Sequence, residues 1–379
     1  MSREPNLIVV GASARAAAFS TLRAGLRPYA IDLFADSDLA DACPTVKVER
    51  YPQDFEAALA AAPQAPWIYT GGLENYPELI TRMAALRSLY GNGADVLRKV
   101  RQPELLAACL AGSEFAVPEI LRKAPGKDAG NWLRKPRCSS GGLGIRWWNE
   151  NDTESEGAKF YYQRFVSGKA KSAVFLAGAM RCELLGITAQ QCSVPEIPEI
   201  PFLYAGSAAA HRGMDADKQY LDALAELGQR LASEFGLFGL FNADLVEPYW
   251  LLEVNPRYSA SVEVLEQARG ENFLARHVVE WDKGLRGERT HRVSECPPHV
   301  AKQVVYAPSD CVVSTAMETL RKSWNCDSRF PSLADIPHSG DRIFRGQPVA
   351  TVFATGGSAR EMERLLEERC QQVRKALIA

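Results

Sequence analysis

The sequence lacks several features that mark whole classes of protein. Its 379 residues carry 44 Lys and Arg against 46 Asp and Glu, a formal net charge of −2, so it has no basic excess of the kind that dedicated nucleic-acid binders use to meet phosphates. No apolar run approaches the roughly 20 residues that cross a bilayer. The start, Met1 to Asn6, has neither the basic nor the long apolar segment of a signal peptide. We therefore expect a cytoplasmic protein that binds neither nucleic acid nor membrane.

Disulfide and zinc patterns are also missing. The nine cysteines are odd in number and scattered, with no Cys-x-x-Cys pair, which is typical of reduced thiols in a cytosolic protein. The five histidines form no close-spaced pair, so a histidine-based metal site has no local support. With 46% apolar and 24% charged residues the composition is that of an ordinary globular protein. A chain of this length predicts two or three domains.

The first 95 residues alternate strand and helix. We expect strands over 7–10, 29–34, 46–48 and 67–69, and helices over 15–25 and 54–62. Because parallel strands need crossover connections, this order predicts an α/β unit with a parallel, Rossmann-like sheet covered on both faces.

The remaining chain predicts two further units, 96–285 and 286–379. In the first we expect helices over 103–111, 219–235 and 272–282, and strands over 132–135, 143–148, 160–166, 172–178, 238–246 and 249–254. In the second we expect strands over 302–306 and 349–353, separated by a turn-rich stretch, and a charged helix over 359–378. The predicted domains are thus 1–95, 96–285 and 286–379.

Oxygen ligands gather on the predicted hairpin of the middle unit. Glu253 and Asn255 are two residues apart on one strand, so their side chains point to the same face. Asp244, on the neighbouring strand, can lie opposite them and complete a set that suits Mg²⁺. Arg257 follows where the strand ends, free to reach a phosphate or carboxylate. A solvent-facing polar edge strand is the alternative interpretation of Glu253 and Asn255.

A second candidate site is the lysine and glycine loop that begins at Lys135. The loop continues through Ser139, Ser140, Gly141 and Gly142, and its backbone N–H groups are of the kind that cradle phosphates. It is not a Walker A loop, because G-x-x-x-x-G-K-[ST] is absent. An ordinary hairpin turn is the alternative interpretation.

Taken together, these motifs resemble the ATP-grasp superfamily. The order is Lys135-Pro136 with its glycine loop, the strand around Tyr162–Val166, and the hairpin ending in Glu253-Val-Asn-Pro-Arg257. The resemblance covers roughly residues 5–285. It implies a Rossmann-like pre-ATP-grasp domain, a two-lobed ATP-grasp domain that clamps the nucleotide, and a small C-terminal β-rich cap.

The resemblance also implies residue roles. Lys135 and Lys99 would contact ATP phosphates, and Arg257 would face the transferring phosphoryl group or an acyl-phosphate. Mg²⁺ would be bound by Asp244, Glu253 and Asn255. The strand beside the adenine would be formed by Gln163, Arg164, Phe165 and Val166.

Three features depart from the family pattern. Arg164 stands where the strand beside the adenine usually has Glu, and Asp244 precedes Glu253 by only nine residues. The usual Asp-Lys before the first helix of the ATP-grasp unit is replaced by Lys99-Val-Arg101. Either Lys99 or Arg101 can therefore fill the role of the second phosphate contact.

The N-terminal glycine loop leaves two interpretations open. Gly11 to Ala16 is a degenerate dinucleotide fingerprint with Asp32 about 20 residues on, so an NAD-binding oxidoreductase stays an alternative. In ligases similar to this chain, the loop holds the acceptor substrate; Ser13 and Arg15 would then bind its carboxylate. Glu74 and Asn75 are a second candidate pair for that pocket. Ordinary helix capping or surface exposure is the alternative interpretation of all four residues.

The resemblance implies an ATP- and Mg²⁺-dependent ligase that joins a carboxylate to an amine through an acyl-phosphate and releases ADP and phosphate. The whole-chain pattern is similar to tyramine–glutamate ligases of one-carbon cofactor biosynthesis. Its partners would be small molecules, with a homodimer as a possible assembly. A non-catalytic nucleotide-binding regulator is a further alternative.

Overall fold

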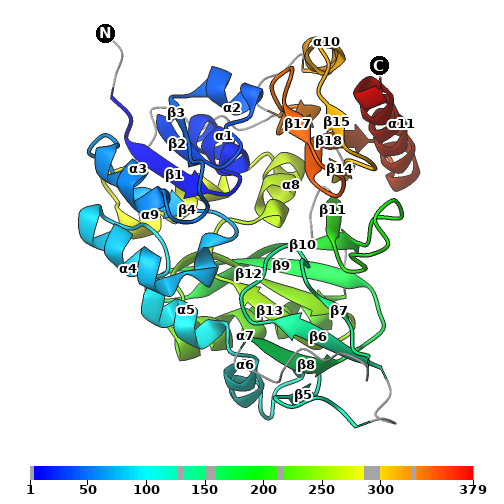
Figure 1. Cartoon of the computed structure of the whole chain (residues 1–379). Helices are drawn as coiled ribbons and strands as arrows, with labels where there is room; N and C mark the ends of the chain where they lie inside the picture. The colour runs from blue at the N-terminus through cyan, green and yellow to red at the C-terminus, as the bar shows by residue number, and fades with distance from the viewer. Residues whose placement is uncertain are drawn as a thin grey trace.

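The computed structural model describes residues 4–126, 131–149, 159–210, 217–285, 299–325 and 330–378. Three groups of strands make up its framework: an N-terminal parallel sheet, a small antiparallel sheet and a large antiparallel sheet that continues into the C-terminal region (Figure 1). The predicted boundary at residue 286 lies outside the described residues.

The N-terminal sheet has four parallel strands in the order β3-β2-β1-β4. The strands are β1 (Leu7–Gly11), β2 (Pro28–Asp32), β3 (Thr45–Lys47) and β4 (Trp67–Tyr69). The helices of this part are α1 (Arg15–Arg23), α2 (Ser37–Ala42), α3 (Phe55–Ala61), η1 (Leu73–Asn75), α4 (Pro77–Leu86) and α5 (Ala94–Val100). The next helix, α6 (Pro103–Cys109), packs instead in the core that contains Phe175 and Phe241. Every residue of β1 is buried, as a strand covered on both faces must be. All four predicted strands are confirmed.

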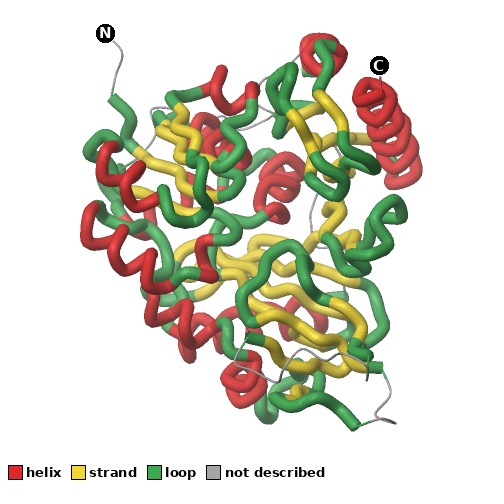
Figure 2. Tube along the Cα trace, viewed as in Figure 1, coloured by secondary structure: helices red, strands yellow, loops and turns green. Residues whose placement is uncertain are grey.

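The small antiparallel sheet has the order β5-β8-β6-β7. Its strands are β5 (Ile120–Leu121), β6 (Trp132–Pro136), β7 (Arg146–Trp147) and β8 (Phe160–Arg164). It lies below the large sheet in Figure 2, and the glycine loop joins β6 to β7.

The large sheet has eight strands in the order β13-β12-β9-β10-β11-β14-β18-β16. Their bounds are β9 (Ala170–Ala177), β10 (Cys182–Cys192), β11 (Tyr204–Ala210), β12 (Gly239–Val246), β13 (Trp250–Asn255), β14 (His299–Tyr306), β16 (Leu333–Ala334) and β18 (Pro348–Gly356). A separate pair is formed by β15 (Cys311–Val312) and β17 (Arg342–Ile343). The C-terminal region therefore extends the large sheet with β14, β18 and β16.

Five helices cover the large sheet and its continuation. They are α7 (Lys218–Phe235), α8 (Ala260–Arg269), α9 (Phe273–Trp281), α10 (Ala316–Trp324) and α11 (Ala359–Ile378). The predicted helix over 219–235 is confirmed as α7, whose Leu224, Leu227 and Leu231 are buried in one core with Phe175 and Phe241. A Cβ on Gly228 would lie 2.4 Å from the Phe175 ring, so the glycine allows α7 to pack closely on β9.

A buried charge network joins three parts of the chain. The Arg15 guanidinium, at the start of α1, pairs with Glu263 of α8, and its Nε donates to Asp335 Oδ1 at 2.9 Å. Lys302 of β14 donates to the second Glu263 oxygen at 2.9 Å. Burial alone would raise the pKa of Asp335, but the Arg15 guanidinium holds it below its usual range. Helix α8 is therefore fixed by charge to both the N-terminal unit and the C-terminal strands.

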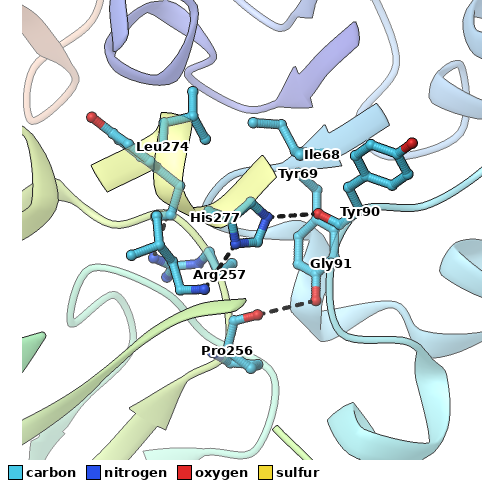
Figure 3. A pocket seen from close by; sticks show the side chains of 10 residues that line it. Ile68, Tyr69, Tyr90, Gly91, Pro256, Arg257, Leu274 and His277 are labelled. Atoms are coloured by element: carbon cyan, nitrogen blue, oxygen red, sulfur yellow. Dashed lines mark hydrogen bonds between the residues drawn. The ribbon is translucent and has the colours of Figure 1, made fainter. Parts of the chain in front are cut away.

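A neutral histidine makes a second connection between the parts. His277 of α9 is buried; its Nδ1 accepts from the Leu240 backbone N–H at 2.8 Å, and its Nε2 donates to the Tyr90 carbonyl at 2.8 Å (Figure 3). Nearby, Tyr69 Oη donates to the Pro256 carbonyl. These bonds fasten the end of β13 to the N-terminal unit and fix the position of the segment that carries Arg257.

We predict that Arg15→Met destabilises the protein by about 3–5 kcal/mol, because the partly buried Asp335 loses its ion pair with Arg15 and the buried Glu263 keeps only Lys302. Urea unfolding followed by circular dichroism measures the change. The control is Arg98→Met, which removes exposed pairs with Glu78 and Asp95 and is expected to cost less than about 1 kcal/mol. Equal losses in the two variants would contradict the buried network.

We predict a pH-dependent contribution from His277. Burial lowers its pKa to about 4, whereas an unfolded histidine titrates near pH 6.5. Between these values the unfolded state binds more protons, so the free energy of unfolding falls by up to about 3 kcal/mol as the pH drops from 6.5 to 4.

The variant His277→Leu removes this titration. It also leaves the Leu240 N–H and the Tyr90 carbonyl unpaired, which costs about 1–3 kcal/mol for each group at neutral pH. Urea unfolding at several pH values is expected to show a wild-type to variant difference that shrinks toward pH 4. The exposed His338 provides the control, His338→Leu; a constant difference for His277→Leu would refute the buried neutral form.

Candidate active site

The three predicted metal ligands lie together on the β12–β13 hairpin. Asp244 pairs with Glu253 in the antiparallel register, and Asn242 pairs with Asn255. The Asn255 Nδ2 donates to Asp244 Oδ2 at 2.9 Å and to Glu253 Oε1 at 3.3 Å. The short hairpin therefore places Asp244, Glu253 and Asn255 on one face, as the two-residue spacing predicts.

Two amides outside the sequence prediction orient Asp244. Its Oδ1 accepts from Gln190 Nε2 at 3.0 Å and from Asn242 Nδ2 at 2.9 Å. Asn242 also donates to Ser172 Oγ at 2.8 Å. The spacing of Asn242, two residues before Asp244 on one strand, indicates that the two side chains share a face. No such spacing indicates Gln190, because it lies on β10, a strand that the sequence does not predict.

The charges at this face influence one another strongly. Removal from water, and then the neighbouring Glu253 carboxylate, raise the pKa of Asp244. Burial alone would also raise the pKa of Glu253, but Lys135 and Arg101 hold it below its ordinary value. Two adjacent carboxylates of this kind are stabilised by a cation between them. The described residues contain no group of three or more His, Cys, Asp or Glu with metal-binding geometry, so a cation here would also need amide, water or phosphate oxygens.

Lys135, on β6, lies across from the Asp244 and Glu253 carboxylates. Its buried Nζ donates to Gln163 Oε1 on β8 at 3.0 Å. Burial alone would lower its pKa, but Tyr161, Glu253 and Asp244 raise it above the ordinary value. The ammonium is therefore charged at neutral pH. The Gln163 Nε2 is buried with no hydrogen-bond partner among the described residues, so its N–H donors are available to a ligand.

The glycine loop after Lys135 is closely packed against the large sheet. Gly142 has φ +79°, and a Cβ there would lie 1.8 Å from the Phe202 carbonyl oxygen, so the position requires glycine. The Gly141 carbonyl accepts from the Tyr204 N–H at 3.0 Å. Within the loop, Ser139 Oγ donates to the Leu143 carbonyl. The backbone N–H of Leu143 donates to the Ser140 carbonyl. The predicted phosphate loop is therefore held in its conformation by hydrogen bonds of its own and by its contact with the segment 202–204.

The segment after Gln163 has an aromatic environment. The Phe165 ring lies 4.8 Å from the Trp147 ring, and Phe202 joins them at 5.6 Å from Trp147. Arg164, the departure from the family pattern, pairs with Glu119 at 3.3 Å and stacks on the Trp132 ring. The Arg164 guanidinium is therefore engaged by Glu119 and Trp132. The apolar rings of Phe165 and Trp147, together with the half-buried Val166, are suited to contact a flat base.

Arg257 and Glu74 connect the hairpin to the N-terminal unit. Arg257 Nε and Nη2 donate to Glu74 Oε1 at 3.0 and 2.7 Å, and Nη2 also donates to Asn255 Oδ1 at 3.0 Å. The side chain of Glu74 is fully buried, yet its Oε2 has no partner among the described residues. This oxygen is therefore an unsatisfied hydrogen-bond acceptor that a ligand could pair with.

Of the two basic candidates on α5 and its end, Arg101 lies nearer the site. Its Nη2 donates to Asn75 Oδ1 at 2.7 Å and to the Ser139 carbonyl at 3.1 Å. Lys99 is exposed on α5. The contact of either residue with a phosphate stays a prediction, and the geometry favours Arg101.

The N-terminal loop residues lie at the junction with the C-terminal region. Ser13 Oγ donates to Asp335 Oδ1 at 3.5 Å. Arg15 is occupied by Glu263 and Asp335, as described above. A substrate carboxylate at these residues stays a prediction, and for Arg15 such a ligand would compete with two buried carboxylates.

Comparison with known proteins agrees with this arrangement. Residues 105–261 match the family model of the ATP-grasp domain. No curated protein sequence matches the chain. Among solved structures, the fold is similar to that of L-amino acid ligase from Bacillus licheniformis, with 11% identity, 98% of each chain covered and a TM-score of 0.67.

Two further structures share the fold. N5-carboxyaminoimidazole synthetase from Staphylococcus aureus, solved with ADP, has 11% identity, 98% coverage of each chain and a TM-score of 0.67. Rhizobium etli pyruvate carboxylase has 15% identity and a TM-score of 0.68, over 96% of this chain but only 37% of its own. Residues 105–261 therefore match an ATP-grasp domain, and the fold of the whole chain is similar to that of these solved structures.

Proposed function

We propose that this protein is an ATP- and Mg²⁺-dependent ligase that joins a carboxylate to an amine. ATP would phosphorylate the carboxylate, the amine would displace phosphate from the acyl-phosphate, and ADP, phosphate and an amide would result. The observation that carries the proposal is the convergence of Asp244, Glu253 and Asn255 with Lys135 and Arg257 at one face. Phosphoryl transfer needs this kind of positioning and charge neutralisation more than it needs a nucleophilic side chain.

The donor set fits Mg²⁺. Asp244, Glu253 and Asn255 offer only oxygen ligands once the Asn255 amide turns its oxygen inward, and the adjacent carboxylates repel each other without a cation. When bound, Mg²⁺ neutralises phosphate charge and orients the phosphate oxygens. Gln190 and Asn242 hold Asp244 in place for this role.

The remaining residues divide between nucleotide and substrate. Lys135 and the Ser139–Gly142 loop would hold the phosphates, and Gln163, Phe165 and Val166 would surround the adenine. Arg257 would stabilise charge on the transferring phosphoryl group, kept in position by Glu74 Oε1. The free Glu74 Oε2 is suited to accept an N–H from the attacking amine.

The NAD alternative is less compatible with the N-terminal loop. The Asp32 carboxylate, which would bind the ribose, already accepts three backbone N–H groups, from Ala14, Phe34 and Ala35. Its oxygens stabilise the loop that follows β1 and β2. A ribose hydroxyl would have to replace these bonds.

We predict ADP release when the purified protein receives Mg²⁺-ATP with pools of carboxylic acids and amines. The similarity to tyramine–glutamate ligases makes glutamate with tyramine the first pair to test, and it would place the reaction in one-carbon cofactor biosynthesis. A coupled assay measures ADP, and mass spectrometry identifies the amide. Absence of ADP with every pool, together with tight NAD binding, would refute the ligase.

We predict that Glu253→Gln lowers turnover at least about 100-fold, because it removes a metal-binding charge from the reacting phosphates. Circular dichroism is expected to be unchanged. The matched control is Glu226→Gln, a change at an exposed residue of α7, for which we expect turnover to change less than about twofold. Wild-type turnover in Glu253→Gln would show that the metal site lies elsewhere.

A further inference from the structure

A cavity of about 470 Å³ lies between the N-terminal unit and the C-terminal strands. Ser13, Asp36 and Lys47 line one side, following or ending β1, β2 and β3. The other side is lined by Asp335, which follows β16, and by Arg342 of β17 and Thr351 of β18. Its size is that of a small-molecule site, and it lies at the carboxyl ends of parallel strands, where open α/β sheets bind ligands.

The lining includes three charged side chains without partners. Within the described ranges, Asp36, Lys47 and Arg342 have no side-chain hydrogen bond or ion pair. Lys47 and Arg342 are exposed, while Asp36 is half-buried. The lining of the cavity therefore includes one half-buried acid and two exposed cations, none of which has a side-chain partner within the described ranges.

Asp36 differs from the carboxylates around it. Asp335 is neutralised by Arg15, and Asp38 accepts the backbone N–H groups of Asp335 and Ile336. Asp32 accepts three backbone N–H groups. Burial, and then the nearby Asp335, Asp38 and Asp32, raise the pKa of Asp36 well above its ordinary value. An unpaired carboxylate in this position is unfavourable unless a ligand supplies a donor.

We propose that this cavity binds a small zwitterion, with its ammonium group on Asp36 and its carboxylate or phosphate on Lys47 and Arg342. The lining contains none of the residues of the Lys135–Arg257 cluster, and binding requires neither ATP nor metal. The cavity is nevertheless close to that cluster. The Ser13 carbonyl accepts from Thr70 Oγ1, and the next residue, Gly71, lies against the Arg257 guanidinium.

Isothermal titration calorimetry without ATP tests the proposal. The probes are ω-amino acids from β-alanine to 6-aminohexanoate, and phosphoethanolamine. We expect at least one to bind with a submillimolar Kd. The amine-only and acid-only analogues, butylamine and butyrate, are expected to bind at least about tenfold more weakly, because each loses one charge contact. No binding of any probe up to about 10 mM would overturn the proposal.

Variants locate the binding. Asp36→Asn is expected to weaken the best probe at least about tenfold. Without ligand the same variant is expected to have a higher Tm than wild type, because it replaces a half-buried carboxyl group that has no partner and lies near three other carboxylates. The double variant Lys47→Ala/Arg342→Ala is expected to weaken binding to a similar extent. The control Asp222→Asn, exposed on α7, is expected to bind as wild type does; unchanged affinity in Asp36→Asn would overturn the assignment.

Discussion

The buried pairing of Arg15 with Glu263 and Asp335 is the constraint on which the arrangement of the parts depends. A guanidinium removed from water is stable only where carboxylates meet it with good geometry. The first turn of α1, helix α8 and the end of β16 must therefore assemble together. Because α8 directly follows the segment that carries Asn255 and Arg257, this pairing also determines where the end of the β12–β13 hairpin lies.

The proposed site is held by neutral and charged contacts from several directions. His277 and Tyr69 bind backbone groups near the start of β12 and the end of β13, and Glu74 positions Arg257 from the N-terminal unit. Opposite them, Lys135 and Gln163 belong to a different sheet. The charges meet only when both sheets are in place, which is the form of preorganisation that phosphoryl transfer uses.

Much of the fold and the hairpin could be predicted because their signals are local. Alternating strands and helices predict the parallel sheet, and the two-residue spacing of Glu253 and Asn255 predicts a shared face. Other elements gave no such signal. In β11, Ala, Gly and Ser have little strand propensity; Gly206 is there because a Cβ would lie 2.2 Å from the Lys302 carbonyl oxygen. In α8, Glu263 and Glu266 are buried, so no amphipathic face distinguishes the helix. The partners of Arg15 are more than 240 residues away, beyond any pattern in sequence.

The order of strands in the large sheet has a mechanical consequence. Backbone hydrogen bonds run without interruption from β13, which carries Glu253, to β16 beside the cavity. The β12–β13 hairpin and the C-terminal strands therefore form one continuous platform, because shearing any neighbouring pair would break several backbone hydrogen bonds. The small sheet that carries Lys135 has its own, separate ladder. The proposed nucleotide site lies between these two sheets, so we expect it to open by movement of the small sheet relative to the large one.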